Sequence, residues 1–260
     1  MKLANLASLA VLLACSVPLS VASDTPVVPD WAQPGSATHQ QVPPPPDFHR
    51  ATKTFPGPIG IFDGQSDIGA AVVPGSASFD PLSKRYTIHS AGYNIWYTRD
   101  EFRYLWKKAS GDLSLAADIA FPNPDGYFDR KVVLVIRQDL DDDSKEVMVA
   151  LHGGGLIHLA QRPEKGGNIK EDARIEAPKA GEATKHAAAP KRLAIEKRGD
   201  TFALYVSLNG EPLHPVGATA QLKLDQPFYV GIGFCSHLPA TSDTAIVSNV
   251  VLENAAGKLK

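Results

Sequence analysis

The strongest constraint on the fold is a repeated alternation of apolar and polar side chains along short stretches of the chain. From 113 to 121, apolar residues occupy every second position, and Ser114 and Asp118 stand between them. Because successive side chains of a strand point to opposite faces, this spacing predicts a half-buried β-strand. The same alternation recurs at 202–206, 228–234 and 246–252. These four stretches predict strands that share a core.

Short apolar runs between turn residues predict further strands, at 85–89, 132–137, 147–152, 156–162 and 192–197. The dipeptide Asn209-Gly210 predicts a two-residue type I′ hairpin turn. A single helical turn is expected around 99–103, and the polar stretch 162–190 predicts a long surface loop. Many short strands with few helical patterns indicate an all-β fold, and about 200 residues suit a jelly-roll sandwich of two antiparallel sheets.

The N-terminus has the features of an export signal. Lys2 precedes an apolar run from 6 to 14, and small residues follow around Ala22. This run is shorter than the about 20 residues that a membrane span needs. We expect a signal peptide over 1–22, and therefore an exported protein that is periplasmic or secreted. The alternative is a lipoprotein signal that ends before Cys15, which would then carry a lipid anchor.

The rest of the chain divides by composition. Seven prolines lie among the 27 residues from 24 to 50, which predicts an extended linker over 23–54. A β-sandwich domain is expected over 55–254, and 255–260 form a short tail. The 26 basic and 28 acidic residues nearly balance, so the sequence lacks the basic excess that nucleic-acid binding needs.

Several short motifs resemble one known superfamily. They are Asn94-Ile95-Trp96, Asp100-Glu101-Phe102, Trp106-Lys107-Lys108, Asp129-Arg130-Lys131, the stretch 151–156 and Cys235-Ser236-His237. Taken in order from about 60 to 253, they resemble a bacterial exported domain of the concanavalin A-like lectin/glucanase superfamily, often fused to Tol-type β-propellers. The resemblance implies a jelly roll with one concave sheet, on which carbohydrate binds. The superfamily often has an acidic residue where this chain has Gly153.

Motifs for catalysis or metal binding are weak. Glycosidases of this fold carry Glu-x-Asp-x-x-Glu on one strand, and this spacing is absent from the sequence. His152 begins a Gly-rich turn that has no Gly-x-Ser-x-Gly partner. Cys235 and His237 would share a face of a strand, but a lone buried cysteine is more often a packing residue. The acidic run 139–143 lacks the Asp-x-Asp-x-Asp-Gly pattern, so it predicts a solvated hairpin tip, with calcium as the lesser alternative.

Aromatic and charged residues gather in one short region, where they could stack on and hydrogen-bond to a ligand. Three other polar residues lie at strand ends or opposite the apolar face of a strand. The predicted ligand-binding residues are Trp96, Arg99, Glu101, Trp106, Lys107, Arg137, His152 and His237. The leading hypothesis is a non-catalytic module that binds carbohydrate or another cell-envelope polymer, without a cofactor. The alternatives are a sugar-active hydrolase or lyase on the same fold and an envelope protein–protein adhesion module.

Overall fold

The computed structural model describes residues 45, 49–175 and 191–254. The predicted signal peptide, Cys15, most of the predicted linker and the tail lie outside these residues. Within them the chain is all β, and no helix has the length and apolar character needed to cross a membrane. The strands are β1 (Lys53–Phe55), β2 (Gly64–Ile68), β3 (Ser76–Asp80), β4 (Arg85–Ser90), β5 (Ile95–Trp96), β6 (Arg99–Asp100), β7 (Phe102–Ala109), β8 (Leu113–Ala120), β9 (Lys131–Arg137), β10 (Glu146–His152), β11 (Ile157–Arg162), β12 (Lys170–Ile175), β13 (Lys191–Arg198), β14 (Thr201–Ser207), β15 (His214–Gln221), β16 (Phe228–Cys235) and β17 (Asp243–Glu253).

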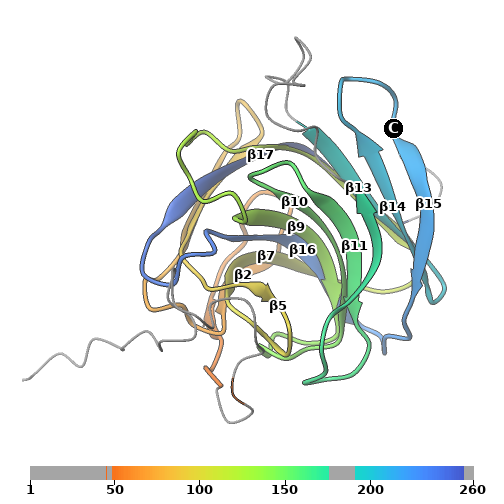
Figure 1. Ribbon diagram of the computed structural model, residues 1–260, viewed down its shortest axis with the longest axis horizontal. Coiled ribbons are helices and arrows are strands. Elements are labelled where there is room, and N and C mark those ends of the chain that lie inside the picture. Colours follow the sequence, from red (N-terminus) through yellow and green to blue (C-terminus); the bar gives the residue numbers. More distant parts are fainter. Residues whose placement is uncertain (1–44, 46–48, 176–190, 255–260) are drawn as a thin grey trace, which may run out of the picture.

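Two large antiparallel sheets form the sandwich. One has the order β1-β2-β7-β16-β9-β10-β11-β12, and the other has the order β15-β14-β13-β8-β17-β4-β3. The first sheet curves around the space that holds β5, so we call its inner side the concave face, and the second sheet lies along its outer side (Figure 1). The structure confirms the predicted all-β sandwich of two antiparallel sheets.

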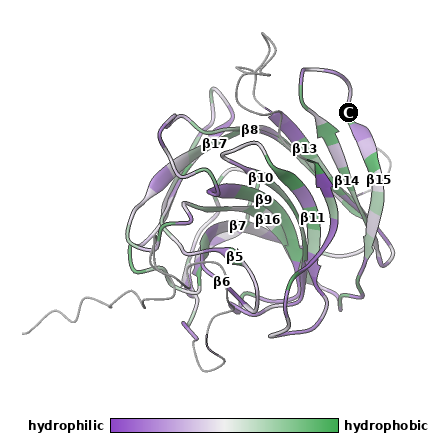
Figure 2. Ribbon diagram, in the orientation of Figure 1, coloured by the Kyte–Doolittle hydropathy of each residue, from purple (hydrophilic) through white to green (hydrophobic). Residues whose placement is uncertain are grey.

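The main core lies between the two sheets. In β9, Val132, Leu134 and Ile136 point into it, and Leu115 of β8 and Ile195 of β13 meet them from the opposite sheet. Figure 2 shows hydrophobic residues along β9, β10 and β16, at the centre of the first sheet. Burial of this apolar surface is the main driving force for folding.

A second apolar cluster covers part of the concave face. Val133 and Val135 alternate with the core residues of β9, and they pack in this cluster with Ile95 of β5. Both faces of β9 are therefore buried, which explains its continuous apolar run. The short hairpin β5–β6 lies over this face, where it can form one wall of a binding site.

Four local predictions are wrong. The expected helical turn at 99–103 is the end of the β5–β6 hairpin and the start of β7. The predicted loop 162–190 contains β12, which pairs with β11, while residues 176–190 lie outside the described part. Six residues separate β14 from β15, so Asn209-Gly210 is not a two-residue turn.

The fourth error concerns the acidic run 139–143. It does form the tip between β9 and β10, but Asp142 is buried rather than solvated. Arg99 forms ion pairs with Asp142 and with Asp143, at 3.3 and 2.6 Å. Among the residues that the structure describes, no group of three or more His, Cys, Asp or Glu could hold a metal ion.

Candidate binding pocket on the concave sheet

A cavity of about 190 Å³ opens on the concave face between the β5–β6 hairpin and the ends of several strands. We call it the concave pocket. It is lined by Asn94, Trp96, Tyr97, Asp129, Lys131, His152, Leu156, His158, Glu171, Arg174 and His237.

The floor of the concave pocket is a row of polar side chains on adjacent strands. Lys131 begins β9, and its register partners are His152 at the end of β10 and Cys235 at the end of β16. His158 of β11 is the register partner of Ala150 in β10. Ala150 lies two residues before His152, so the side chains of His158 and His152 point to the same face of the sheet. The imidazole rings of His152 and His158 have their centroids 5.1 Å apart.

The β5–β6 hairpin forms the wall. Asn94 Oδ1 accepts a hydrogen bond of 2.7 Å from Lys131 Nζ, which ties the start of the hairpin to the floor. The Trp96 ring lies 5.0 Å from the His158 ring and 5.7 Å from Lys131 Nζ, measured from its centroid. An aromatic side chain therefore stands beside a cation and an imidazole.

Tyr97, at the turn of this hairpin, has a φ of 52°, which lies in the left-handed region. Such a backbone conformation costs a non-glycine residue about 1–3 kcal/mol and persists where surrounding contacts enforce it. The Tyr97 carbonyl accepts hydrogen bonds from Ile169 N at 3.1 Å and from Arg162 Nε at 3.3 Å. His237, on the other side of the pocket, is also left-handed, with a φ of 67°.

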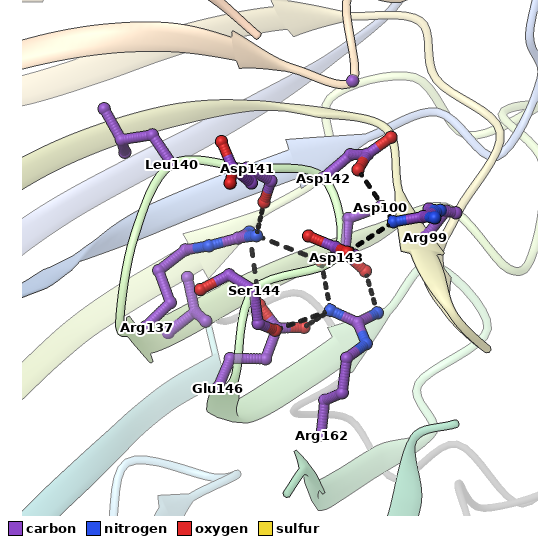
Figure 3. Close-up of polar contacts among 12 residues, drawn as sticks. Arg99, Asp100, Arg137, Leu140, Asp141, Asp142, Asp143, Ser144, Glu146 and Arg162 are labelled. Carbon is purple, nitrogen blue, oxygen red and sulfur yellow. Dashed lines mark hydrogen bonds and ion pairs between the residues drawn. The ribbon is translucent and has the colours of Figure 1, made fainter. Parts of the chain in front are cut away.

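A buried ion-pair network joins the β5–β6 hairpin to the first sheet (Figure 3). It consists of Asp100, Arg137, Glu146 and Arg162. Arg137 Nη2 lies 3.3 Å from Asp100 Oδ2, and its Nη1 lies 3.2 Å from Glu146 Oε2. Arg162 also forms ion pairs with Asp100 and with Glu146. All four side chains are fully buried, and burial raises the pKa of Glu146 to about 7. The network joins β6 to β9, β10 and β11.

Burial controls the protonation of the pocket floor. Burial, reinforced by the nearby Lys131 cation, lowers the pKa of His152 to about 4. Burial, with His152 and Lys131 adding to it, lowers the pKa of His158 well below its ordinary value. Burial also lowers the pKa of Lys131. Both imidazoles are therefore neutral at pH 7, so each presents one donor and one acceptor nitrogen.

Part of the hydrogen-bonding capacity of the pocket is unused within the described structure. His152 Nδ1 lies 3.3 Å from Asp129 Oδ1, but His152 Nε2 and both ring nitrogens of His158 make no hydrogen bond. Glu171 Oε1 accepts a 3.0 Å bond from Arg174 Nε, whereas Glu171 Oε2 accepts none. Leaving a buried polar group unsatisfied costs about 1–3 kcal/mol. Several such groups around one cavity indicate a binding site for a polar ligand.

Three of the residues predicted from the sequence meet in the concave pocket, namely Trp96, His152 and His237. His237 stacks on Tyr127, with ring centroids 5.5 Å apart. It does not share a strand face with Cys235, because β16 ends at Cys235. Burial raises the pKa of the Cys235 thiol to about 11, so the thiol is protonated at neutral pH and is a packing residue.

The other predicted residues lie elsewhere. Arg99 pairs with the acidic tip, and Arg137 belongs to the buried ion-pair network. Glu101 is buried and pairs with Arg50 at 3.1 Å. Trp106 donates its indole N–H to Ser66 at 2.9 Å, and Lys107 forms a surface pair with Asp63 at 2.7 Å. These five residues do not line the pocket.

Sequence reasoning missed Lys131, His158, Glu171 and Arg174. The sequence around Lys131 and His158 does contain a pattern that could have identified them. Lys131 stands directly before the apolar run 132–136, and His158 stands between Ile157 and Leu159, so each is a polar side chain next to buried apolar positions. The other two, Glu171 and Arg174, lie on β12, in the stretch for which the sequence predicts a loop.

A second, larger cavity of about 710 Å³ lies between the β3–β4 hairpin and the bulged end of β17. Its apolar rim includes Ile61 and Val251. Its polar groups bond to one another, because Arg192 Nη1 pairs with Asp118 at 2.8 Å and also bonds to the Asn249 carbonyl at 3.0 Å. The unsatisfied groups described above therefore distinguish the concave pocket from this cavity.

Comparisons with known proteins support the fold. No protein-family model and no curated protein matches the sequence. A functionally unknown protein from Saccharomyces cerevisiae has a similar structure, with a TM-score of 0.53 and 13% identity over 70% of this chain and 93% of that protein. The GH43 BlXynB protein from Bacillus licheniformis is similar over 69% of this chain, with a TM-score of 0.51 and 13% identity. A xylan β-1,4-xylosidase from Bacillus halodurans C-125 is similar over 78% of this chain, with a TM-score of 0.50 and 16% identity.

This chain spans only 35% and 38% of the lengths of those two proteins, respectively. At such low identity the similarity shows the fold alone. The fold of the chain is an all-β sandwich of two large antiparallel sheets.

Proposed function

We propose that this protein is an exported, non-catalytic module that binds carbohydrate in the concave pocket. The observation that carries the proposal is the position of Trp96 beside the unsatisfied nitrogens of His152 and His158. Sugars present an apolar ring face, which stacks on aromatic rings, and hydroxyl groups, which both donate and accept hydrogen bonds. A neutral imidazole has one donor nitrogen and one acceptor nitrogen, so it can form both kinds of hydrogen bond with a hydroxyl group.

The size of the concave pocket favours a single sugar ring, either free or at the end of a chain. Its volume of about 190 Å³ is smaller than the about 300–1,000 Å³ of sites for larger ligands. The names of two of the similar proteins, a GH43 protein and a xylosidase, agree with a carbohydrate ligand. Export and a tethering role for the linker rest on the N-terminal sequence.

A glycan array followed by calorimetric titration of the purified protein tests this proposal. We expect a sugar ligand whose affinity falls about tenfold or more with Trp96→Ala, since aromatic stacking and ring burial are lost. Trp106→Ala is the matched control, because Trp106 lies on the same sheet outside the pocket. If no glycan binds to the folded protein, or if both variants bind equally well, the proposal is wrong.

One observation favours an enzyme as the second candidate. Asp129 contacts Nδ1 of His152, whose side chain lines the concave pocket, and a carboxylate-oriented neutral imidazole can act as a general base. Incubation of polysaccharides with the wild type and with His152→Ala tests this candidate. Product formation that requires His152 would replace the binding module with a sugar-active enzyme, whereas intact polysaccharide with retained binding would support the module.

A further inference from the structure

Lys131 is a buried cation at the centre of the concave pocket. Its side chain is only 2% exposed, and its ammonium group donates one hydrogen bond, to Asn94 Oδ1 at 2.7 Å. Among the described residues, Lys131 Nζ forms no ion pair with a carboxylate, and Asp129 and Asp100 act on its charge only from a distance. An ammonium group has three donors and prefers a negatively charged partner when it is buried.

The other charged groups of the pocket already have partners. Arg174 pairs with Glu171 at 3.0 Å, and Asp129 contacts His152 at 3.3 Å. Asp129 favours the charged form of Lys131 from a distance, but burial opposes it more strongly. His152 and His158 are neutral at pH 7, so neither adds a charge. Of the two pocket cations in the described structure, Lys131 and Arg174, only Arg174 has a carboxylate as an ion-pair partner.

The neighbours of Lys131 place this charge where a ligand would meet it. Trp96 lies 5.7 Å away on the wall, and His152 is the register partner of Lys131 on the floor. A sugar ring stacked on Trp96 would bring a substituent of the ring toward Lys131 Nζ. A neutral hydroxyl would leave the buried charge uncompensated, whereas an anionic group would neutralise it.

We propose that the ligand of the concave pocket is an acidic sugar, whose single negatively charged substituent binds Lys131. This inference rests on the proposed function and narrows its ligand class. A carboxylate of a uronic acid and a sulfate ester share the required chemistry. A folded variant that lacks the charge at position 131 separates this inference from the proposed function.

The experiment titrates the protein with matched sugars: glucose, glucuronic acid and glucose 6-sulfate, and the corresponding galactose and mannose series. We expect an acidic member to bind about tenfold to a hundredfold more tightly than its neutral counterpart, because a charge-assisted hydrogen bond replaces a neutral one. The comparison of uronic acid with sulfate ester identifies which anion is preferred.

Lys131→Met tests the residue, because methionine keeps much of the length of lysine without its charge. We expect this variant to lose the preference for the acidic sugar, and to melt at an equal or higher temperature than the wild type, since a buried unpaired charge is removed. Lys107→Met is the control, because Lys107 is exposed and pairs with Asp63. It should retain the preference.

The outcomes separate the two claims. Equal or tighter binding of the neutral sugar, or a Lys131→Met variant that keeps the acidic preference, overturns the acidic-sugar inference and leaves the binding module standing. Failure of every sugar to bind the folded wild type counts against both.

Discussion

Asp100 and Arg162 form a two-point ion pair in which neither side chain is exposed to solvent. Arg162 Nη2 lies 2.6 Å from Asp100 Oδ1, and Arg162 Nη1 lies 2.7 Å from Asp100 Oδ2. Asp100 ends β6, whereas Arg162 ends β11. This pair therefore fixes the β5–β6 hairpin to the concave sheet and sets the position of Trp96 above the pocket floor.

Removal of the Asp100 charge should destabilise the protein strongly. Asp100→Asn leaves Arg137 and Arg162 buried with Glu146 as the remaining carboxylate of the network. Breaking a buried pair in this way costs about 3–5 kcal/mol of unfolding free energy. Urea denaturation monitored by fluorescence measures the change.

The matched control is Asp63→Asn, which breaks the exposed pair with Lys107. Exposed pairs contribute about 0–1 kcal/mol, so this variant should unfold close to the wild type. Similar midpoints for the two variants would show that the buried ion-pair network does not hold the hairpin.

Gly231→Ala should disrupt the centre of the concave sheet. Gly231 lies in β16, and a Cβ atom there would overlap the backbone carbonyl of Leu105 in β7. Backbone atoms inside a sheet cannot move aside cheaply, so we expect a loss of about 1–3 kcal/mol or more. Gly154→Ala is the control, since its nearest neighbour would be 3.4 Å away at an exposed turn. Calorimetry measures the melting temperatures of the two variants. Equal melting temperatures would contradict the close approach of Gly231 to the Leu105 carbonyl.

The two histidines of the pocket floor should make stability fall as the pH drops from about 6.5 toward 4, whereas Glu146, whose pKa burial raises to about 7, acts in the opposite direction between about pH 7 and 4.5. The pKa of His152 is lowered to about 4 in the folded protein, and the pKa of His158 is lowered well below its ordinary value. Between the ordinary histidine pKa of 6.5 and these lowered folded-state pKa values, the unfolded chain binds protons that the folded protein does not, so acid favours unfolding. For His152 the full effect is on the order of 3 kcal/mol.

The double variant His152→Gln/His158→Gln should lose part of this pH dependence. The measurement is the difference in unfolding free energy between pH 7 and pH 4.5, compared with that of the wild type. His214→Gln provides the control, because His214 is exposed on β15. A double variant as acid-sensitive as the wild type would contradict the assignment of neutral imidazoles.

Cys235 should resist alkylation in the native protein. Its side chain is buried, and burial raises its pKa to about 11, so little thiolate exists at pH 8. Iodoacetamide should modify Cys235 only after unfolding in urea, as peptide mass analysis would show. Rapid labelling of the folded protein would indicate an accessible thiolate, and would reopen a nucleophilic role for this residue.

Sequence periodicity was sufficient to predict most of the long strands. The alternation in β8, β14 and β16, and the apolar run in β9, reflect side chains that must enter the core, and this requirement is local to each strand. The errors occurred where local sequence is ambiguous. The polar strand β12 pairs at the edge of the sheet, and β6 is only two residues long.

The sequence by itself determined most of the long strands, the sandwich class and the candidate role of Trp96, His152 and His237. Only the tertiary structure decided that these residues meet at one pocket with Lys131 and His158, while Arg137, Arg99 and Glu101 form ion pairs elsewhere. The reason is physical: alternation fixes the face on which a side chain points, but cross-strand register and hairpin placement fix its neighbours. Those neighbours are distant in the sequence, as Asn94 and Lys131 are, and no local pattern encodes the contact.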